Sequence, residues 1–528
     1  MSTAPLLSRP AFDSAAVDLC EAVLHGNRLI LASNRGPTEF VFDEEGQLKA
    51  RRGAGGVTTA LSNVARYCKA TWVASAVTEG DREAVRTLGS SFASFDPTQD
   101  LRMRLLSLDP RCHHYYYNVF CNSALWFLQH EMANTAPLPV SVIRDAWRNG
   151  YIPANRDFAS AIAKEVKKQK GPALVMLHDY HLYLVPDYLR RKAPEALLQQ
   201  FVHIPWPSPE KWNRLRRPMV KAICRGLSAN DIVGFQTERD VENFLSTVEA
   251  FLDQARVDRR RRSVYLNGHT MHARHYPISV DVGHLRNLAA SPELAAHVRR
   301  LRLRCAEQTI VRVDRMDPSK NIARGFRAYE LVLRQHPELH GKVKFLTFLV
   351  PSRSEIREYR DCTSEVFQVV EEINRQYGRS GWRPIEVFFE HDYAQALAAL
   401  SLYDVLLVNP MADGMNLVSK EGPTLNTCNG VLVLSRQAGS APQLKAGALM
   451  VDAFDVVGTA GALHRALTMK REGRRMRLLQ LHRAIETEDL ERWFYRQMRD
   501  LWLLQTMRRD IPEPISWPDE AFAAVGWA

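Results

Sequence analysis

The chain has 528 residues, of which 46% are hydrophobic and 24% charged, and its formal net charge is +11. No apolar run approaches the roughly 20 residues of a membrane span, so a membrane protein is excluded. The basic runs at residues 259–262 and 470–477 have no aromatic residues between them and no nucleic-acid-binding motif beside them. We interpret them as solvated faces rather than a nucleic-acid interface, although an anionic substrate would also favour a positive field.

Two features of the sequence bear on the cellular location of the protein: the N-terminus and the cysteines. Residues 1–19 lack a basic segment followed by an apolar core, so we expect no secretory signal. The eight cysteines are scattered without a C-x-x-C pair. Reduced thiols in a cytoplasm are the simplest interpretation.

Short apolar strands alternate with amphipathic helices along most of the chain. We predict strands at residues 28–32, 71–74, 173–177, 200–203, 231–235, 276–280, 309–313, 343–350, 385–389, 405–408 and 430–435. We predict helices at residues 57–67, 157–168, 238–251, 322–334, 354–377 and 394–401. This alternation favours parallel sheets that are covered by helices on both faces.

The alternation falls into two blocks, so we predict an α/β protein with two Rossmann-like, doubly wound domains facing a central cleft. The expected parts are residues 1–283, residues 284–480, and residues 481–528 with a helix that packs back across both domains. The last helical region, residues 474–507, is long and carries tryptophan and phenylalanine. Facing domains would place the carboxyl ends of both sheets on one cleft.

A glycine loop and two polar clusters mark the first block. G-A-G-G at residues 53–56 precedes a predicted helix, where a glycine backbone can approach an anion, but a plain tight turn is equally compatible. H-D-Y-H at residues 178–181 and H-I-P-W-P at residues 203–207 each follow a strand. We predict Asp179 as a hydroxyl-binding group or base and His203 as a functional histidine. The alternatives are a helix-capping aspartate and a core histidine.

The spacing of His178 and His181 resembles a metal-site fragment. A third ligand at characteristic spacing is missing from the sequence, so we do not favour a metal.

Two further motifs follow strands in the second block. Arg315 and Lys320 lie five residues apart around a proline turn, where they could neutralise a diphosphate leaving group; a capped turn with solvated charges is the alternative. The run D-G-M-N-L-V-S-K-E at residues 413–421 lies where a strand gives way to a helix. Backbone N–H groups collect there and suit a diphosphate, and Glu421 is placed to accept from a sugar diol.

The motifs in their order resemble one family. They are S-N-R (33–35), G-A-G-G (53–56), Y-N-V-F-C-N-S-A-L-W (117–126), H-D-Y-H-L (178–182), H-I-P-W-P (203–207), G-F-Q-T-E (234–238), R-M-D-P-S-K (315–320), P-S-R (351–353) and D-G-M-N-L-V-S-K-E (413–421). This set is similar to the trehalose-6-phosphate synthases, retaining GT-B glycosyltransferases of family 20. The resemblance implies α-glucosyl transfer from a nucleotide-glucose to glucose 6-phosphate, with no required metal and no cofactor.

The resemblance also implies a role for each matching residue. Donor binding would fall to Gly56, Arg315, Lys320, Asp413, Gly414, Met415, Asn416, Leu417, Val418 and Glu421. Acceptor binding would fall to Arg35, Tyr117, Trp126, Asp179 and Arg353. The groups nearest the chemistry would be His203, Asp179, Arg315 and Lys320. Family precedent implies front-face attack, in which the departing phosphate oxygen takes the acceptor proton and no covalent enzyme intermediate forms.

Two positions depart from the family pattern. Asn321 stands where a glycine is usual, and Tyr393 stands where a basic residue is usual. The form R-x-D-P-x-K-N also resembles the related pseudo-glycosyltransferases, which join a nucleotide-cyclitol to a cyclitol phosphate. A catalytically silent sugar-phosphate sensor is a third alternative. The sequence leaves open the donor base (uridine, guanosine or adenosine), the exact acceptor, and whether the chain forms a homo-oligomer.

Overall fold

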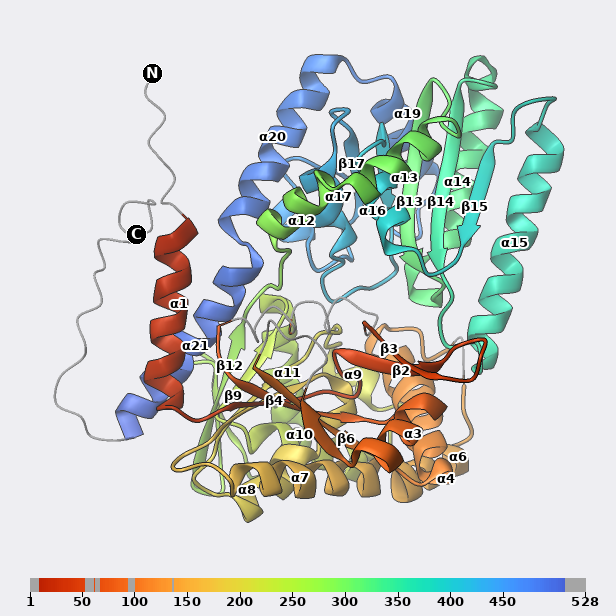
Figure 1. Ribbon diagram of the computed structural model, residues 1–528. Helices are drawn as coiled ribbons and strands as arrows, with labels where there is room; N and C mark the ends of the chain where they lie inside the picture. The colour runs from red at the N-terminus through yellow and green to blue at the C-terminus, as the bar shows by residue number, and fades with distance from the viewer. Residues whose placement is uncertain (1–8, 53–60, 62–66, 94–99, 135–136, 509–528) are drawn as a thin grey trace.

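The computed structural model describes residues 9–52, 61, 67–93, 100–134 and 137–508. They form two α/β units, one stacked on the other, each with its own sheet (Figure 1). We call them the first unit and the second unit in chain order. The structure thus has the two-block organisation that the sequence predicts.

The first unit is built on a sheet of ten strands among the described residues, in the order β10-β11-β12-β9-β8-β7-β1-β4-β6-β5. The strands are β1 (Leu29–Ala32), β4 (Ala70–Ser75), β5 (Ser91–Ala93), β6 (Leu101–Leu106), β7 (Leu174–His178), β8 (Leu197–Phe201), β9 (Ile232–Phe235), β10 (Arg256–Asp258), β11 (Ser263–Leu266) and β12 (His269–His275). The strands from β12 to β6 run parallel, and β10, β11 and β5 add antiparallel edges. A separate hairpin joins β2 (Thr38–Phe42) to β3 (Leu48–Arg52).

Helices cover both faces of this sheet, which explains why its central strands are apolar throughout. In β1, Ile30 and Ala32 face one core cluster while Leu29 and Leu31 face the other. The helices of this unit are α1 (Arg9–Leu24), α3 (Glu79–Leu88), α4 (Pro110–His113), η1 (His114–Leu125), α5 (Trp126–Gln129), α6 (Val140–Ala146), η2 (Trp147–Tyr151), α7 (Ile152–Val166), η3 (Tyr180–Leu182), α8 (Val185–Lys192), α9 (Pro209–Trp212), α10 (Arg217–Ser228) and α11 (Glu238–Phe251).

The second unit has a fully parallel sheet in the order β15-β14-β13-β16-β17-β18. Its strands are β13 (Gln308–Arg315), β14 (Val343–Val350), β15 (Ile385–Phe389), β16 (Val405–Val408), β17 (Val431–Ser435) and β18 (Leu449–Val451). Its helices are α12 (Val282–Ala289), α13 (Pro292–Arg302), η4 (Pro318–Lys320), α14 (Ile322–Gln335), η5 (Pro337–Leu339), α15 (Arg357–Tyr377), α16 (Tyr393–Leu400), α17 (Val418–Leu425), α18 (Ala441–Leu444), α19 (Val456–Leu467) and α20 (Arg471–Thr487). Neighbouring residues such as Leu406 and Leu407 again face opposite core clusters.

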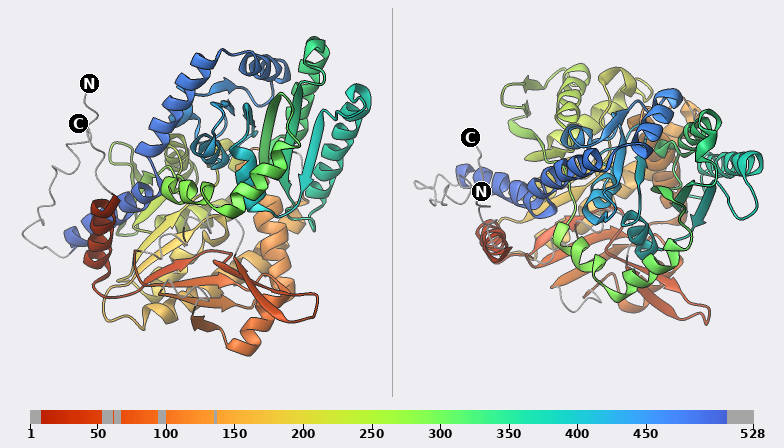
Figure 2. Two further views of the ribbon diagram at one scale, coloured as in Figure 1. Left: turned by 45° about the horizontal axis from the view of Figure 1, so that its top comes forward. Right: turned by 90° about the horizontal axis from the view of Figure 1, so that it is seen from above.

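The chain crosses between the units twice, and the two crossings touch. The first crossing is residues 276–281, and the second lies between α20 and α21 (Leu490–Arg508), where the Leu490 N–H donates to the Val280 carbonyl at 3.2 Å. Helix α21 then packs on the first unit beside α1 (Figure 2). The helical region predicted at residues 474–507 is therefore two helices, and residue 480 lies inside α20.

Two predicted strands need correction. Residues 276–280 are not a strand; they form the first crossing, and the strand before them is β12. The Ile278 N–H donates to the Gln236 side chain at 3.0 Å, and its carbonyl accepts from the Lys420 ammonium at 2.8 Å. Side chains thus satisfy the backbone groups that a partner strand would otherwise pair. The strand predicted at residues 200–203 is β8, which begins earlier and ends at Phe201.

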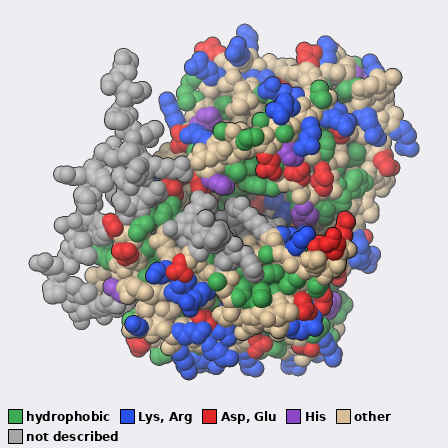
Figure 3. All heavy atoms as spheres, in the orientation of Figure 1, with side chains coloured by type: hydrophobic (Ala, Val, Ile, Leu, Met, Phe, Trp, Pro, Cys, Tyr) green, Lys and Arg blue, Asp and Glu red, His purple; other side chains and the backbone are tan. Residues whose placement is uncertain are grey.

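The surface supports the interpretation of residues 259–262 as a solvated face, whereas in residues 470–477 Arg474 is largely covered and pairs with Asp404 at 2.7 Å. On the face drawn in Figure 3, basic side chains are scattered over both units with acidic side chains among them. Within residues 259–262, Arg259 pairs with Glu242 at 3.2 Å and Arg262 pairs with Glu238 at 3.3 Å. Among the helices of the described residues, none is both long and apolar enough to cross a bilayer.

Candidate active site

The ends of β7 and β8 place Asp179 beside His203. Asp179 has a φ of 73° and a ψ of 176°, a backbone conformation that is costly for a residue with a Cβ. Its carboxylate accepts from the His203 N–H at 3.1 Å, and it forms no side-chain cap to the following helix. Burial raises the pKa of the Asp179 carboxyl to about 7, against the opposing effect of Arg353 and Arg315.

His203 is held by a second histidine. Its Nε2 lies 3.2 Å from Nδ1 of His178, so one ring donates a hydrogen bond to the other. Burial, with a further contribution from His178, lowers the pKa of His203 well below its ordinary value. A buried and neutral imidazole therefore stands at the same sheet edge as the Asp179 carboxyl.

The four residues assigned to the acceptor phosphate come together from distant segments. The Arg35 guanidinium lies 3.4 Å from the Tyr117 hydroxyl, and Arg353 stacks over the Trp126 ring at 4.2 Å from its centroid. Burial opposes ionisation of Tyr117, but Arg35 and Arg353 outweigh it and lower the pKa of this phenol to about 8. These side chains form a positive, aromatic-walled region.

Asp317 joins this region to the predicted diphosphate cations, and the sequence interpretation missed it. Its fully buried carboxylate lies 3.7 Å from Arg315 and 3.6 Å from Arg353, and it accepts from the Tyr359 hydroxyl at 3.1 Å. Burial opposes its ionisation, but the arginines dominate and lower the pKa of Asp317 to about 2. Its position inside R-M-D-P-S-K, between Arg315 and Lys320, is the signal that could have found it.

Lys320 and Asp413 form a close ion pair between two loops of the second unit. The Lys320 Nζ lies 2.5 Å from Asp413 Oδ2, which also accepts from the Asn416 amide at 3.0 Å. Burial raises the pKa of Asp413, but Lys320 outweighs burial and holds it below its ordinary value. Arg315 lies 5.6 Å from the Trp126 ring centroid, so the donor cations border the acceptor residues.

The loop after Asp413 reaches across to the first unit. A Cβ built on Gly414 would lie 1.8 Å from the His203 carbonyl oxygen, so this close approach requires glycine. Met415, next in sequence, is buried in a core cluster that belongs mainly to the first unit. Asn416 has a φ of 69°, and its side chain accepts from the Ser419 N–H at 3.2 Å at the start of α17.

The two departures from the family pattern have structural explanations. Asn321 has a φ of 59°, a left-handed conformation that glycine adopts easily and asparagine tolerates, and its amide donates to the Asn409 and Ala453 carbonyls at 3.0 and 2.7 Å. Tyr393 hydrogen-bonds to Glu421. Burial raises the pKa of Glu421 to about 7, which this hydrogen bond partly counteracts.

Leu417 and Val418 stand where the sequence predicts, at the N-terminus of α17. Gly56 and most of the helix predicted at residues 57–67 lie outside the described residues. The remaining predicted donor residues, from Arg315 to Glu421, lie at or after the carboxyl ends of β13 and β16 in the second sheet.

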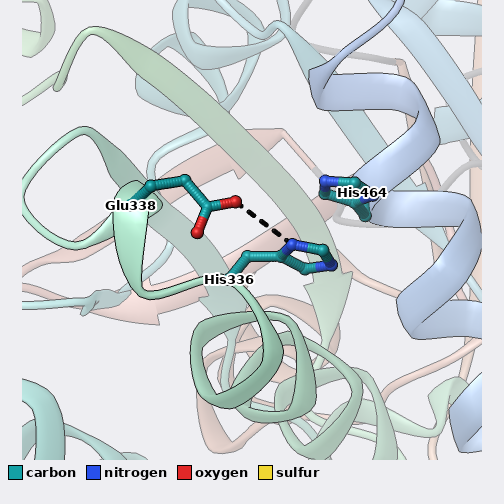
Figure 4. Close-up of side chains that lie close together, drawn as sticks. All are labelled: His336, Glu338 and His464. Carbon is teal, nitrogen blue, oxygen red and sulfur yellow. Dashed lines mark hydrogen bonds and ion pairs between the residues drawn. The ribbon is translucent and has the colours of Figure 1, made fainter.

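One set of three side chains among the described residues has ligand atoms close enough together to hold a metal ion (Figure 4). None of the three is a predicted site residue. His336 and Glu338 follow α14, and His464 is on α19. The two imidazole rings stack at 3.6 Å with an interplanar angle of 4°. Parallel rings direct their in-plane lone pairs side by side, whereas a tetrahedral metal needs them to converge. His178 and His181 do not belong to this set.

Residues 27–502 match the model of Glycosyltransferase family 20. The chain belongs to this family. A family 20 relative, the UDP-forming alpha,alpha-trehalose-phosphate synthase A of Dictyostelium discoideum, is 28% identical over 470 residues, which cover 88% of this chain. The family 20 chain described here spans 61% of the length of that relative.

Two solved structures resemble the family 20 chain over nearly their whole length. One is a trehalose-6-phosphate protein of E. coli bound with UDP-2-fluoro glucose, at 28% identity and a TM-score of 0.77, covering 90% of this chain and 99% of that one. The other is a UDP-forming synthase of Burkholderia xenovorans in complex with glucose-6-phosphate, at 27% identity and a TM-score of 0.78, covering 90% and 100%. The predicted GT-B fold and family are therefore confirmed.

Proposed function

We propose that this protein is a retaining glycosyltransferase that moves an α-glucosyl group from a nucleotide-glucose to glucose 6-phosphate. The products are trehalose 6-phosphate and a nucleoside diphosphate. The observation that carries the proposal is the Asp317 carboxylate, whose Oδ2 lies 3.7 Å from Arg315 and 3.6 Å from Arg353. A reaction between two phosphate-bearing substrates needs two adjacent but separate cationic centres, and this arrangement supplies them.

On the donor side, Arg315 and Lys320 would hold the diphosphate, helped by backbone N–H groups at Gly56 and at the start of α17. Asp413 and the backbone of Gly414, Met415 and Asn416 would hold hydroxyls of the donor sugar. Glu421 would bind the ribose. The pairing of Lys320 with Asp413 at 2.5 Å supports a shared role, because one residue would meet the phosphate and the other the sugar attached to it.

On the acceptor side, Arg35, Tyr117, Trp126 and Arg353 would grip the phosphate of glucose 6-phosphate. Asp179 would bind acceptor hydroxyls, and His203 would contact the donor sugar near the reacting carbon. We propose residues 1–283 as the acceptor-binding part, residues 284–480 as the donor-binding part and residues 481–528 as the part that returns across both.

The chemistry would be front-face attack. As the bond from the sugar to the diphosphate breaks, Arg315 and Lys320 neutralise the charge that develops on the leaving oxygen. That oxygen takes the proton of the attacking hydroxyl. Asp179 is a poor nucleophile here, because its carboxylate already accepts from the His203 N–H and its pKa lies near 7. A covalent glycosyl-enzyme that forms in the native protein and is lost in an Asp179→Asn variant would contradict this scheme.

The test is a donor panel of UDP-, GDP- and ADP-glucose with glucose 6-phosphate. We expect release of a nucleoside diphosphate together with an α,α-linked disaccharide phosphate. UDP-glucose comes first, because the Dictyostelium relative is named UDP-forming. Glucose without phosphate is the matched control acceptor and should react poorly. Binding of both substrates without turnover from any donor would overturn the proposal in favour of a sensor.

The pseudo-glycosyltransferase alternative rested on Pro318 and Asn321 in the sequence. The Asn321 amide donates to two backbone carbonyls, and the residue has a left-handed backbone conformation. Local backbone structure therefore explains why asparagine stands at this position. We propose that the protein is cytoplasmic, and its eight free cysteines support this location. Whether it forms a homo-oligomer can be measured by size-exclusion chromatography with light scattering.

A further inference from the structure

A crevice of about 1050 Å³ lies at the junction of the two units, apart from the candidate active site. Its walls come from the end of β12 and the start of α11 in the first unit, from residues 436–443 in the second unit, and from α21. Of the predicted site residues, Asp413 is the one that also borders it. A cavity of this size can accommodate a small metabolite.

The crevice is rich in arginine. Seven arginines line it, namely Arg239, Arg262, Arg274, Arg436, Arg492, Arg496 and Arg499, together with five carboxylates. Two of those carboxylates are engaged elsewhere: Asp413 pairs with Lys320, and Asp240 accepts from the Trp206 N–H at 2.9 Å. The three that remain are Glu238, Glu488 and Asp500.

These three carboxylates are shared among the cations. Asp500 lies 3.2 Å from Arg499 and 3.8 Å from Arg274, and it also accepts from the Tyr276 hydroxyl at 2.6 Å. Glu488 pairs with Arg496 at 2.9 Å. Arg436 is exposed and makes no ion pair with any described residue. Two other lining arginines have partners outside the crevice: Arg239 lies 4.0 Å from Glu131, and Arg492 donates to the Thr487 carbonyl at 3.1 Å. The seven lining guanidinium groups still outnumber the three remaining carboxylates of the crevice.

We propose that this crevice binds a small phosphate-bearing anion. Guanidinium groups match phosphate oxygens in a fork geometry, and closely spaced arginines without matching acids favour an anion between them. Arg436 comes from the second unit and Arg499 from α21, so a bound anion would hold the two units and the returning helix together. This site does not depend on the transfer reaction.

The crevice also connects to the donor side through the backbone. The Gly439 N–H donates to the Asp413 carbonyl at 3.0 Å, and the Asp413 N–H donates to the Gln437 carbonyl at 3.3 Å. An anion that contacts Arg436 would order this loop, and the loop holds the backbone of the aspartate that pairs with Lys320. The crevice and the donor side therefore share one loop.

Calorimetric titration of the full-length protein with pyrophosphate tests the proposal, without either substrate present. We expect two binding events, one in the crevice and one at Arg315 and Lys320. An Arg436→Ala, Arg499→Ala double variant should weaken the first at least tenfold and leave the second. Arg315→Ala should weaken the second and leave the first. Arg475→Ala, which removes an exposed arginine of α20 outside the crevice, is the matched control.

The proposal is overturned by a single pyrophosphate site that Arg315→Ala removes, or by a double variant that binds as the native protein does. The single Arg436→Ala variant provides the same test with less risk to folding, because it breaks no ion pair among the described residues. A rise in Tm with pyrophosphate that Arg436→Ala lowers, but Arg475→Ala does not, would support the site independently. Since no substrate is used, failure here is distinct from failure of the transfer assay.

Discussion

The donor side and the acceptor side of the candidate site are built in different ways. Lys320 is neutralised by Asp413, which comes from the same sheet edge. Arg353 instead meets a tryptophan face and the hydroxyl of Tyr180, with the Asp317 carboxylate further away at 3.6 Å. The donor side is thus an ion-paired site before any ligand binds, whereas the acceptor side combines an ion pair of Arg35 with Glu39 at 3.0 Å and an Arg353 that meets aromatic and neutral groups. The difference predicts strong effects from charge removal on the donor side and graded, pH-dependent effects on the acceptor side.

The largest expected effect comes from Lys320→Ala. This change removes a cation at the leaving group and leaves the Asp413 carboxylate buried without it, so kcat/KM should fall by roughly 10²-fold or more. Steady-state rates with the best donor of the panel measure it. Lys320→Arg, which keeps the charge, is the control and should retain part of the activity. Near-normal turnover by the alanine variant would remove Lys320 from the chemistry.

Asp317→Asn should come next, because it loosens both sides together. Loss of the charge would free Arg315 and Arg353 to shift, and we expect about a tenfold to hundredfold loss in kcat/KM. The distinguishing result is a rise in KM for donor and acceptor alike, whereas Arg315→Ala should affect mainly the donor. An Asp317→Glu variant that restores both KM values would support a positioning role. A change in one KM alone would show that Asp317 does not link the two sides.

The acceptor side should respond to pH through Tyr117. Its pKa is lowered to about 8, so the neutral phenol prevails below pH 8 and the phenolate above it. The phenolate would neutralise Arg35 and repel the acceptor phosphate, so KM for glucose 6-phosphate should rise above pH 8. Tyr117→Phe should raise KM about tenfold at pH 7 by removing a hydrogen bond, and should abolish this alkaline rise. An alkaline rise that persists in the phenylalanine variant would assign it to another group.

The smallest expected effect concerns Tyr393 and Glu421. The Glu421 carboxyl has a pKa of about 7. If it binds the ribose as proposed, it accepts best when ionised, so KM for the donor should rise as pH falls below 7. Because the Tyr393 hydrogen bond lowers this pKa, Tyr393→Phe should move the rise to higher pH and raise KM about threefold at pH 7. Initial rates between pH 6 and 8 measure both. An unshifted profile would mean that Tyr393 does not control the ionisation of Glu421.

The second sheet was the part most predictable from sequence. The strands predicted at residues 343–350, 385–389 and 405–408 have the bounds of β14, β15 and β16. β16 is an uninterrupted apolar run, and β14 and β15 are mostly apolar with Lys344, Thr347 and Glu386 as the exceptions. Parallel strands that are largely buried have such apolar runs, which makes their limits easy to find. The β2–β3 hairpin was missed because β3 reads L-K-A-R-R, which has no apolar run.

The same contrast applies to the candidate site. Arg315 ends β13, and Lys320 and Asp413 follow strands, so sequence position alone indicated them. Tyr117 and Trp126 are contributed by η1 and α5, a helical segment whose aromatic residues are equally typical of a core, and only the family resemblance indicated a role. The sequence did not indicate Asp317, because its importance comes from its contact with Arg353. That residue is 36 positions away in the sequence, and the fold brings it to 3.6 Å.

The contact between Gly414 and the His203 carbonyl has a consequence for water. A nucleotide-sugar is an activated compound, and a transferase that exposes it to solvent would waste it by hydrolysis. The loop proposed to hold the donor sugar begins at Asp413, and its next residue touches the backbone of the histidine proposed to face the reacting carbon. On the proposed assignment, the donor is fully surrounded only while the two units are in contact. If the two units separated, water would enter and the groups proposed to surround the reacting carbon would move apart at the same time. The donor would therefore be shielded from water whenever the site is assembled for transfer.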